Sequence, residues 1–303
     1  MEMKQQFQMS DLGLLSYYLG IEVNQGPAGI ALCQAAYTRK ILEKCGLASC
    51  NPTATPMENR LKLSKSSTEP AVNATEYRSI IGALRYLLHT RPDLAFAVGY
   101  LSRFMEEPRD DHLAAVKRVL RYLAGTQEHG LFYTRHGDGP AKLAGYSDAD
   151  LAGCVDTRRS TSGIIFFLGG NPISWQSNKQ KVVALSSCEA EYMAAAAAAC
   201  QGIWLARLLT DMVGSESGAS ELWVDNQSAI ALSKNPVFHD RSKHIDVRYH
   251  FIRECVEEGR IALKFITTEQ QMADGLTKAL GRVRFQELRK KIGINAPGDR
   301  AAD

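Results

Sequence analysis

The stretch Thr161-Ser-Gly-Ile-Ile-Phe-Phe-Leu-Gly-Gly-Asn-Pro-Ile-Ser-Trp-Gln176 sets the pattern of the second half of the chain. Two runs rich in β-branched and aromatic residues flank Gly169-Gly-Asn171, a sequence typical of a tight turn. The pattern therefore predicts two strands, over 161–168 and 173–176, joined as a hairpin.

The residues on both sides of this hairpin extend the same architecture. A strand is predicted before it over 143–147, and a long helix after it over 187–213, where Ser186 and Glu189 have the spacing of a capping box. Further strands are predicted over 221–224 and 261–266, and further helices over 227–233, 246–258 and 269–280. This order favours a mixed sheet with helices packed on it.

The first half of the chain has a different pattern. After a strand-like start over 12–23, it predicts helices over 36–45, 76–90, 93–105 and 111–123, with a loop rich in Pro, Ser, Thr and Asn over 51–74. Residues 130–140 contain three glycines and a proline, and we place the boundary between the halves there.

Composition limits the class of protein. The chain has 303 residues, 45% of them hydrophobic, which is enough for a buried core and two domains. A net charge of +3 does not by itself indicate a nucleic-acid binder, and the cations gathered over 278–291 fit a solvated helix face equally well. A polar N-terminus and seven scattered cysteines favour a cytoplasmic or nuclear protein that is not secreted and not in a membrane.

Four acids stand where strands end or where helices could pack across those ends. They are Asp148, Glu191, Asp225 and Asp274. If they converge, their mutual repulsion calls for a hard divalent cation, Mg²⁺ or Mn²⁺, and two ions ~3.5–4 Å apart would suit phosphodiester hydrolysis. Taken singly, each acid could instead be a turn or capping residue, and Asp150 and Glu189 are competing neighbours.

The order of short motifs in the second half resembles the ribonuclease H domain of copia-type LTR retrotransposon polyproteins. The matching strings are Gly-Tyr-Ser-Asp-Ala-Asp (145–150), Arg-Ser-Thr-Ser-Gly (159–163), Ile-Ser-Trp (173–175), Leu-Ser-Ser-Cys-Glu-Ala-Glu-Tyr (185–192), Asp-Asn-Gln-Ser-Ala-Ile (225–230), Lys-His-Ile-Asp (243–246), His-Phe-Ile-Arg-Glu (250–254) and Ala-Asp-Gly-Leu-Thr-Lys (273–278). In the first half, Tyr-Leu-Gly-Ile-Glu-Val (18–23), Thr-Arg-Pro-Asp (90–93) and Arg-Tyr-Leu-Ala-Gly-Thr (121–126) resemble the same polyprotein.

The resemblance implies an α/β fold, with a ribonuclease H-like mixed five-stranded sheet flanked by helices over 141–294. Residues 1–140 would be a mainly helical region like a reverse transcriptase thumb and connection, and 295–303 a disordered tail. The family's aromatic-x-Asp-Asp polymerase motif is missing from this sequence, so polymerase activity is not expected from this chain alone. Asp110-Asp111 is better explained as the start of a helix.

The resemblance also implies the substrate and the residues that hold it. Asp148, Glu191, Asp225 and Asp274 would be both catalytic and metal-binding, and the substrate would be the RNA strand of an RNA–DNA hybrid. Asn226 and Gln227 could contact the 2′-hydroxyl, and the candidates for phosphate contacts are Arg158, Arg159, Lys179 and Lys181. His244 and His250 also lie in the matching motifs, and the resemblance leaves their role open.

Two interpretations follow. The first is a metal-dependent endoribonuclease of the ribonuclease H type, supported by the four intact acids. The alternative is a domesticated or truncated transposon product that binds nucleic acid or a protein partner of unknown identity without cleaving, as the missing polymerase motif suggests.

Overall fold

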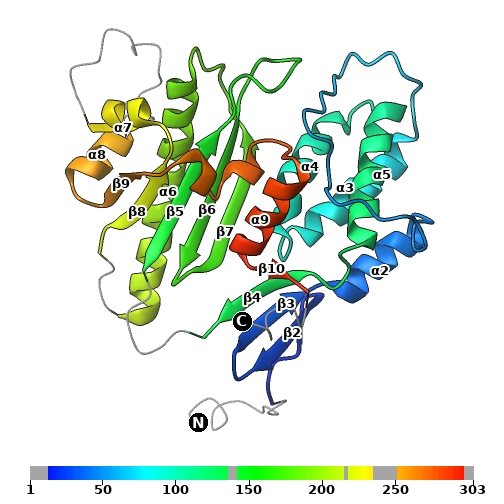
Figure 1. The fold of residues 1–303 in the computed structure, drawn as a ribbon, viewed down its shortest axis with the longest axis horizontal. Coiled ribbons are helices and arrows are strands. Elements are labelled where there is room, and N and C mark those ends of the chain that lie inside the picture. Colours follow the sequence, from blue (N-terminus) through cyan, green and yellow to red (C-terminus); the bar gives the residue numbers. More distant parts are fainter. Residues whose placement is uncertain (1–12, 136–141, 215–217, 235–250, 297–303) are drawn as a thin grey trace, which may run out of the picture.

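The chain folds around two five-stranded sheets (Figure 1). This computed structural model describes residues 13–135, 142–214, 218–234 and 251–296. One sheet belongs to the first half of the chain, apart from its last strand, and the other is built wholly from the second half.

The first half combines a small antiparallel sheet with a group of helices. Its sheet has the order β1-β2-β3-β4-β10. The strands are β1 (Tyr17–Tyr18), β2 (Ile21–Gly26), β3 (Gly29–Cys33), β4 (Gly130–Thr134) and β10 (Ile294–Asn295). The helices are α2 (Ala35–Lys44), α3 (Ala74–Leu87), η1 (Pro92–Leu94), α4 (Ala95–Leu101), η2 (Ser102–Phe104) and α5 (Asp110–Ala124). The α5 helix begins at Asp110, as the sequence predicts.

The second half forms the mixed sheet that the sequence predicts. Its strands are β5 (Leu143–Ala149), β6 (Thr161–Leu168), β7 (Asn171–Lys179), β8 (Ser220–Val224) and β9 (Ile261–Phe265), in the order β7-β6-β5-β8-β9. The first three pair antiparallel, whereas β8 pairs parallel with both β5 and β9. This is a five-stranded mixed α/β sheet, as the motif resemblance implies.

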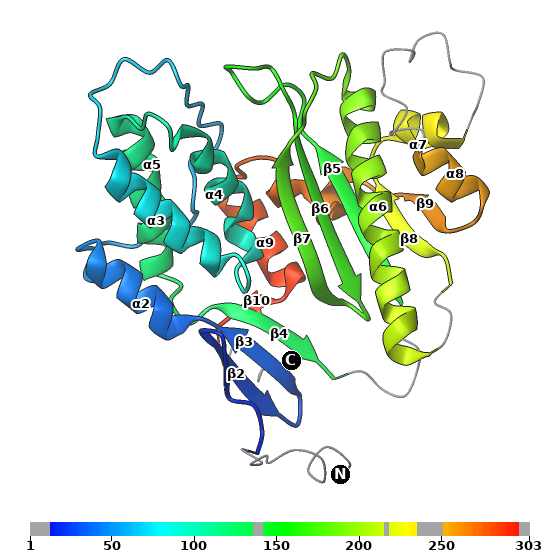
Figure 2. The same ribbon diagram turned by 180° about the vertical axis from the view of Figure 1, so that it is seen from behind.

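Helices cover both faces of the mixed sheet (Figures 1 and 2). The long helix α6 (Ser187–Val213) lies on one face, with the shorter α7 (Gln227–Lys234) and α8 (Phe251–Glu257) beside it. On the other face lie η5 (Thr268–Gln270), η6 (Asp274–Leu276) and α9 (Arg282–Ile292). Because it is covered from both sides, β6 is almost wholly buried.

Small residues let α6 lie close to the sheet. A Cβ at Gly145 of β5 would come within 2.4 Å of the ring of Phe166, and one at Gly202 of α6 within 3.1 Å of the same ring. Glycine at both positions therefore makes room for a fully buried phenylalanine between strand and helix. By length and composition α6 could cross a membrane, but its buried face, with Ala195 and Ala199, packs in the core of the mixed sheet.

Two expectations at the edges of the elements are wrong, and one strand was not predicted. Residues 130–134, within the segment where the sequence places the boundary between the halves, form β4 and pair with β3. The helix predicted over 269–280 is two short 3₁₀ helices, η5 and η6. The tail predicted from 295 begins with Asn295 paired to Gly130 in the sheet of the first half. Residues 136–141 and 297–303 lie outside the described residues.

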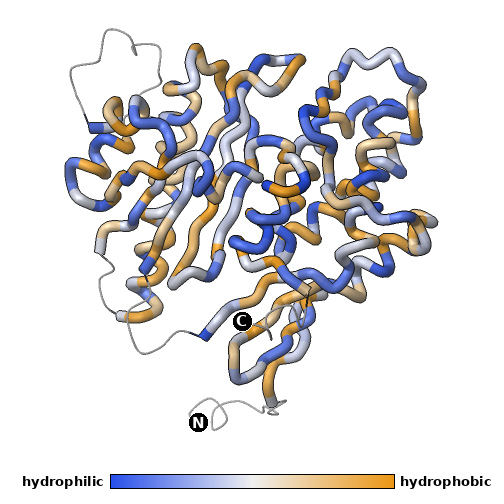
Figure 3. The backbone as a smooth tube through the Cα atoms, viewed as in Figure 1, coloured by the Kyte–Doolittle hydropathy of each residue, from blue (hydrophilic) through white to orange (hydrophobic). Residues whose placement is uncertain are grey.

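The two halves of the chain pack against each other and are not connected by a linker alone. Phe285 of α9 belongs to the core of the first half, where its ring meets that of Tyr122 edge-on, with 5.6 Å between the centroids. Between the sheets, Leu131, Ile165 and Ile294 pack in one cluster. The helix α9, mostly hydrophilic in Figure 3, is thus held by its few apolar residues between the halves.

Candidate active site

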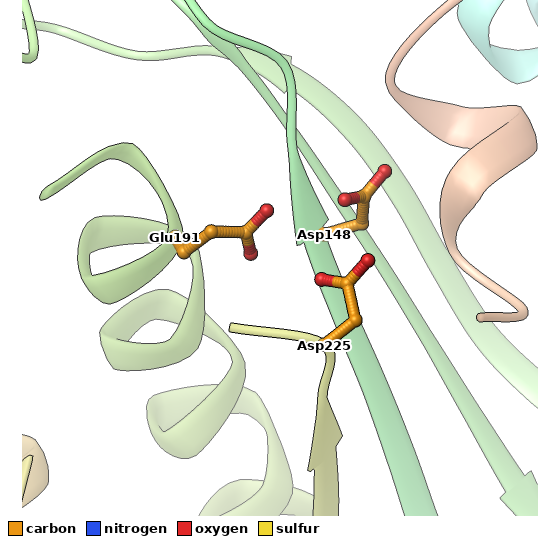
Figure 4. Close-up of side chains that lie close together, drawn as sticks. All are labelled: Asp148, Glu191 and Asp225. Carbon is orange, nitrogen blue, oxygen red and sulfur yellow. The ribbon is translucent and has the colours of Figure 1, made fainter. Parts of the chain in front are cut away.

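Two aspartates meet because their strands are parallel neighbours. The pairing of β5 with β8 places Ser147 beside Val224, so the next residue of each strand, Asp148 and Asp225, emerges at the same edge of the sheet. Glu191 reaches this edge from the second turn of α6, as Figure 4 shows. Carboxylate oxygens of the three residues lie within 4.8 Å of one another.

The helix that carries Glu191 begins where the sequence predicts. The Ser186 hydroxyl accepts a hydrogen bond from the backbone N–H of Glu189 at 3.2 Å, and a carboxylate oxygen of Glu189 accepts one from the N–H of Leu185 at 2.9 Å. Glu189 therefore serves the start of the helix. Glu191, two residues further along α6, points toward the ends of β5 and β8.

The site concentrates negative charge in a buried place. Asp148 is only 4% exposed and Glu191 only 6%. Burial, with the charges of Asp148 and Asp225 added, raises the pKa of Glu191 to about 10. Burial also raises the pKa of Asp148, against the opposing effects of Lys278 and of a hydrogen bond from Thr277. Three carboxylates held this way favour the binding of a positive charge.

The donor set fits a hard divalent cation. One oxygen of Glu191 accepts a 3.1 Å hydrogen bond from the N–H of Ala149, but the other, Oε2, is buried and has no hydrogen-bond partner among the described residues. A buried acceptor without a partner is costly, and a bound cation would satisfy it. Clustered carboxylate oxygens are the ligands that Mg²⁺ and Mn²⁺ prefer.

Asp274 lies beside this group, and its carboxylate is held by cations. It is in η6, where Lys278 Nζ lies 2.6 Å from its Oδ1 and Arg284 Nε lies 3.6 Å from its Oδ2. Its charge contributes to the raised pKa of Asp148, so it belongs to the same electrostatic site. The structure thus brings three of the four predicted acids together and places the fourth next to them.

Two residues of the site were not singled out from the sequence. The Thr277 hydroxyl donates a 2.6 Å hydrogen bond to Oδ2 of Asp148, which fixes that carboxylate. Burial lowers the pKa of Lys278, but the nearby Asp148 and Asp274 outweigh this effect and leave it raised. The signal was the Asp-x-x-x-Lys spacing of 274–278, which sets opposite charges one turn apart.

The predicted substrate-binding residues do not touch the three acids in any described contact. Asn226 caps α7 by accepting a 3.0 Å hydrogen bond from the N–H of Ala229, and Gln227 is exposed at the start of that helix. The four cations lie in the loop after β5 and at the end of β7; they are Arg158, Arg159, Lys179 and Lys181. His244 and His250 lie outside the described residues.

Asp150, the neighbour that competed with Asp148, has a different environment. Its carboxylate accepts a hydrogen bond from the N–H of Thr161 and packs against Gly153, so it closes the loop between β5 and β6. It is not part of the three-acid group.

Comparisons with known proteins place the chain in a family. Residues 1–59 match the sequence profile described as reverse transcriptase (RNA-dependent DNA polymerase). The chain is 45% identical over 292 residues to the retrovirus-related Pol polyprotein from transposon RE2 of Arabidopsis thaliana, covering 96% of this chain and 20% of the relative. It is 40% identical over 304 residues to that from transposon TNT 1-94 of Nicotiana tabacum, covering 97% and 23%.

The similarity of this chain to solved structures is weaker than its similarity to these Pol polyproteins. A ribonuclease H1 isolated from compost is 16% identical with a TM-score of 0.32, covering 45% of this chain and 92% of that one. The chain spans about a fifth of the length of the curated Pol relatives it matches. From these sequence matches, the chain belongs to the retrotransposon Pol polyprotein family, and its first 59 residues match the reverse transcriptase profile.

Proposed function

We propose that this chain is a metal-dependent endoribonuclease that cleaves the RNA strand of RNA–DNA hybrids. The observation that carries the proposal is the convergence of Asp148, Glu191 and Asp225 within 4.8 Å at the edge of the mixed sheet. Three acids, two of them buried, are unfavourable in a protein without a cation to bind. The resemblance of the motifs to the ribonuclease H domain of copia-type polyproteins supports the choice of substrate class.

The chain's own residues prepare the site before any substrate arrives. Thr277 holds one oxygen of Asp148 and the Ala149 N–H holds one oxygen of Glu191, so both carboxylates are oriented in advance. Asp225 accepts a 3.0 Å hydrogen bond from the Thr268 hydroxyl. Divalent cations bound by such a cluster activate water and stabilise the leaving oxygen of a phosphodiester.

A pair of ions is the finer form of this proposal. Asp148 and Asp225 would flank both ions, Glu191 would bind one, and Asp274 would complete the second position. In the structure Lys278 lies against Asp274 at 2.6 Å, so its ammonium supplies positive charge where the second ion would bind.

Recognition of the hybrid has two components. Asn226 and Gln227, beside Asp225, would read the 2′-hydroxyl of the RNA strand. Arg158, Arg159, Lys179 and Lys181 would contact phosphates, which makes binding dependent on salt and largely independent of sequence.

The decisive experiment is cleavage of an end-labelled RNA–DNA hybrid by the purified chain, with Mg²⁺ and with EDTA. We expect cleavage of the RNA strand only with the metal, and none of a DNA duplex of the same sequence. Hybrid binding without cleavage in Mg²⁺ would instead favour a binding module without catalytic activity. Equal cleavage in EDTA would contradict the metal-dependent mechanism.

A further inference from the structure

A basic pocket lies beside the acid cluster, at the junction of the two halves of the chain. Its volume is about 400 Å³, and its walls come from the loop at 59–62, from α4 and η2, from the loop after β5 and from the segment 277–284. Five of its lining residues are cations against one acid, Asp150. The cations are Arg60, Lys62, Arg103, Lys278 and Arg284.

Three residues that line the pocket also contact acids of the site. Thr277 donates its hydrogen bond to Asp148, and Lys278 and Arg284 both pair with Asp274. A strand whose phosphodiester lies at Asp148 would therefore extend directly along the pocket wall. The two sites are therefore joined through Thr277 and Lys278.

Two of the pocket's cations from the first half are not neutralised by an ion pair among the described residues. Arg60 and Lys62 are exposed, and neither forms an ion pair with an acid among the described residues. Arg103 packs its guanidinium over the ring of Tyr100 at 4.8 Å and donates a 3.0 Å hydrogen bond to the hydroxyl of Thr161. Arg103 also acts electrostatically on Asp150, whereas Arg60 and Lys62 keep their side of the pocket positive.

The residues directly after Arg60 and Lys62 are anchored to both halves of the chain. The Tyr100 hydroxyl accepts a 2.9 Å hydrogen bond from the N–H of Leu63. Asp156, in the loop after β5, accepts hydrogen bonds from the Ser64 hydroxyl at 2.5 Å and from the N–H of Lys65 at 3.1 Å. The first half therefore holds its cations against the second half without needing the substrate to order them.

We propose that this pocket binds the phosphodiester backbone of the strand being cleaved, so that Arg60 and Lys62 of the first half are substrate-binding residues. The proposal rests on the proposed ribonuclease function. Arginine and lysine in a concave, pre-ordered site are suited to the phosphates of a polyanion, and each contact releases counterions. The strand assignment follows from the shared residues Thr277 and Lys278, which link the pocket to the site of chemistry.

The test is a double variant, Arg60→Asn with Lys62→Gln, in the full chain. Asparagine suits position 60, where the backbone has a φ of 61°. The control is Lys40→Gln with Arg207→Gln, which removes the same charge from two exposed cations, on α2 and on the distal half of α6. Binding of a fluorescent RNA–DNA hybrid is measured in EDTA by anisotropy over a series of salt concentrations.

We expect the Arg60/Lys62 variant to bind more weakly, by about tenfold for each lost contact at 0.1 M salt, with a salt slope shallower by about 2. The control should keep both the affinity and the slope of the wild type. If the variant matches the wild type while the wild type binds and cleaves the hybrid, the pocket proposal is overturned and the proposed function stands. If the wild type neither binds nor cleaves, both fall.

A second arm assigns the strand. Methylphosphonate linkages remove the charge from one strand of the hybrid at a time. We expect the affinity difference between the variant and the wild type to persist when the DNA strand is neutral and to vanish when the RNA strand is neutral. The reverse result would overturn the assignment of the pocket to the cleaved strand.

Discussion

The ammonium of Lys278 lies 2.6 Å from Oδ1 of Asp274, four residues before it, and so a positive charge is built into the edge of the acid cluster. The raised pKa of this lysine, caused mainly by Asp148 and Asp274 acting against burial, shows that it serves more than one carboxylate. In the protein without metal, Lys278 therefore provides part of the charge balance that a divalent cation would supply.

Replacing this lysine tests that balance. Lys278→Met should lower the melting temperature of the metal-free protein. The free energy of unfolding should fall by about 1 kcal/mol or less, because the lysine side chain is half exposed. The loss should be larger at pH 8 than at pH 5, where more of the carboxyls are protonated. Added Mg²⁺ should raise the melting temperature more in the variant than in the wild type. Lys290→Met, on the exposed side of α9, is the control and should change neither quantity.

Glu191 predicts a pH dependence of stability. In the folded, metal-free protein its raised pKa of about 10 keeps the proton bound, whereas the unfolded chain loses it near the ordinary value of 4.5. Between these values the folded state holds more protons, so the free energy of unfolding falls as pH rises, by up to about 1.4 kcal/mol per pH unit.

Urea unfolding in EDTA from pH 5 to pH 9 measures this slope. Glu191→Gln removes the titrating group, and the variant should gain stability over the wild type as pH rises. A wild-type stability that stays level across this range, or a variant with the same slope, would show that Glu191 is ionised in the folded protein.

Asp225→Asn separates chemistry from binding. The change is nearly isosteric, but a neutral amide is a poorer ligand for a hard cation, so turnover on the hybrid should fall by orders of magnitude while hybrid binding stays near normal. Asp150→Asn is the control because Asp150 closes a loop and lies outside the three-acid group. A similar loss of turnover in both variants would mean that the catalytic carboxylates are wrongly assigned.

The buried pair Arg91–Asp93 predicts a stability effect far from the site. Both side chains are almost wholly buried, with 2.8 Å between Nη2 and Oδ2, and the Tyr122 hydroxyl donates a 2.7 Å hydrogen bond to Asp93. Asp93→Asn leaves the guanidinium without a counter-charge and should cost about 3–5 kcal/mol in urea unfolding. Glu128→Gln, which breaks the exposed pair with Arg39, should cost less than about 1 kcal/mol.

The sequence predicts best those elements whose pattern is local and long. The strand over 161–168 and the helix over 187–213 have the predicted bounds, because β-branched runs, a glycine turn and a capping box each act over a few residues. The proximity of Asp148 and Asp225 could also be predicted, because neighbouring parallel strands end at the same edge of the sheet.

Elements that depend on distant partners escape such patterns. Asn295 belongs to a two-residue strand whose partner, Gly130, lies far away along the chain. Asp274 is in a 3₁₀ turn rather than a helix, in a segment that packs on β6. The position of Arg60 beside the acid site follows from the docking of the two halves, which no local spacing encodes.

The pairing of β10 with β4 sets the order in which the polypeptide can fold as it is translated. Leu131 leaves the ribosome roughly 160 residues before Ile294, its partner, which at typical synthesis rates is roughly ten to thirty seconds. During that time one edge of β4 is open, and an open strand edge is a template for pairing with other chains. During synthesis, the sheet formed by β1 to β4 therefore lacks its last strand, β10, until residues 294–295 have been translated.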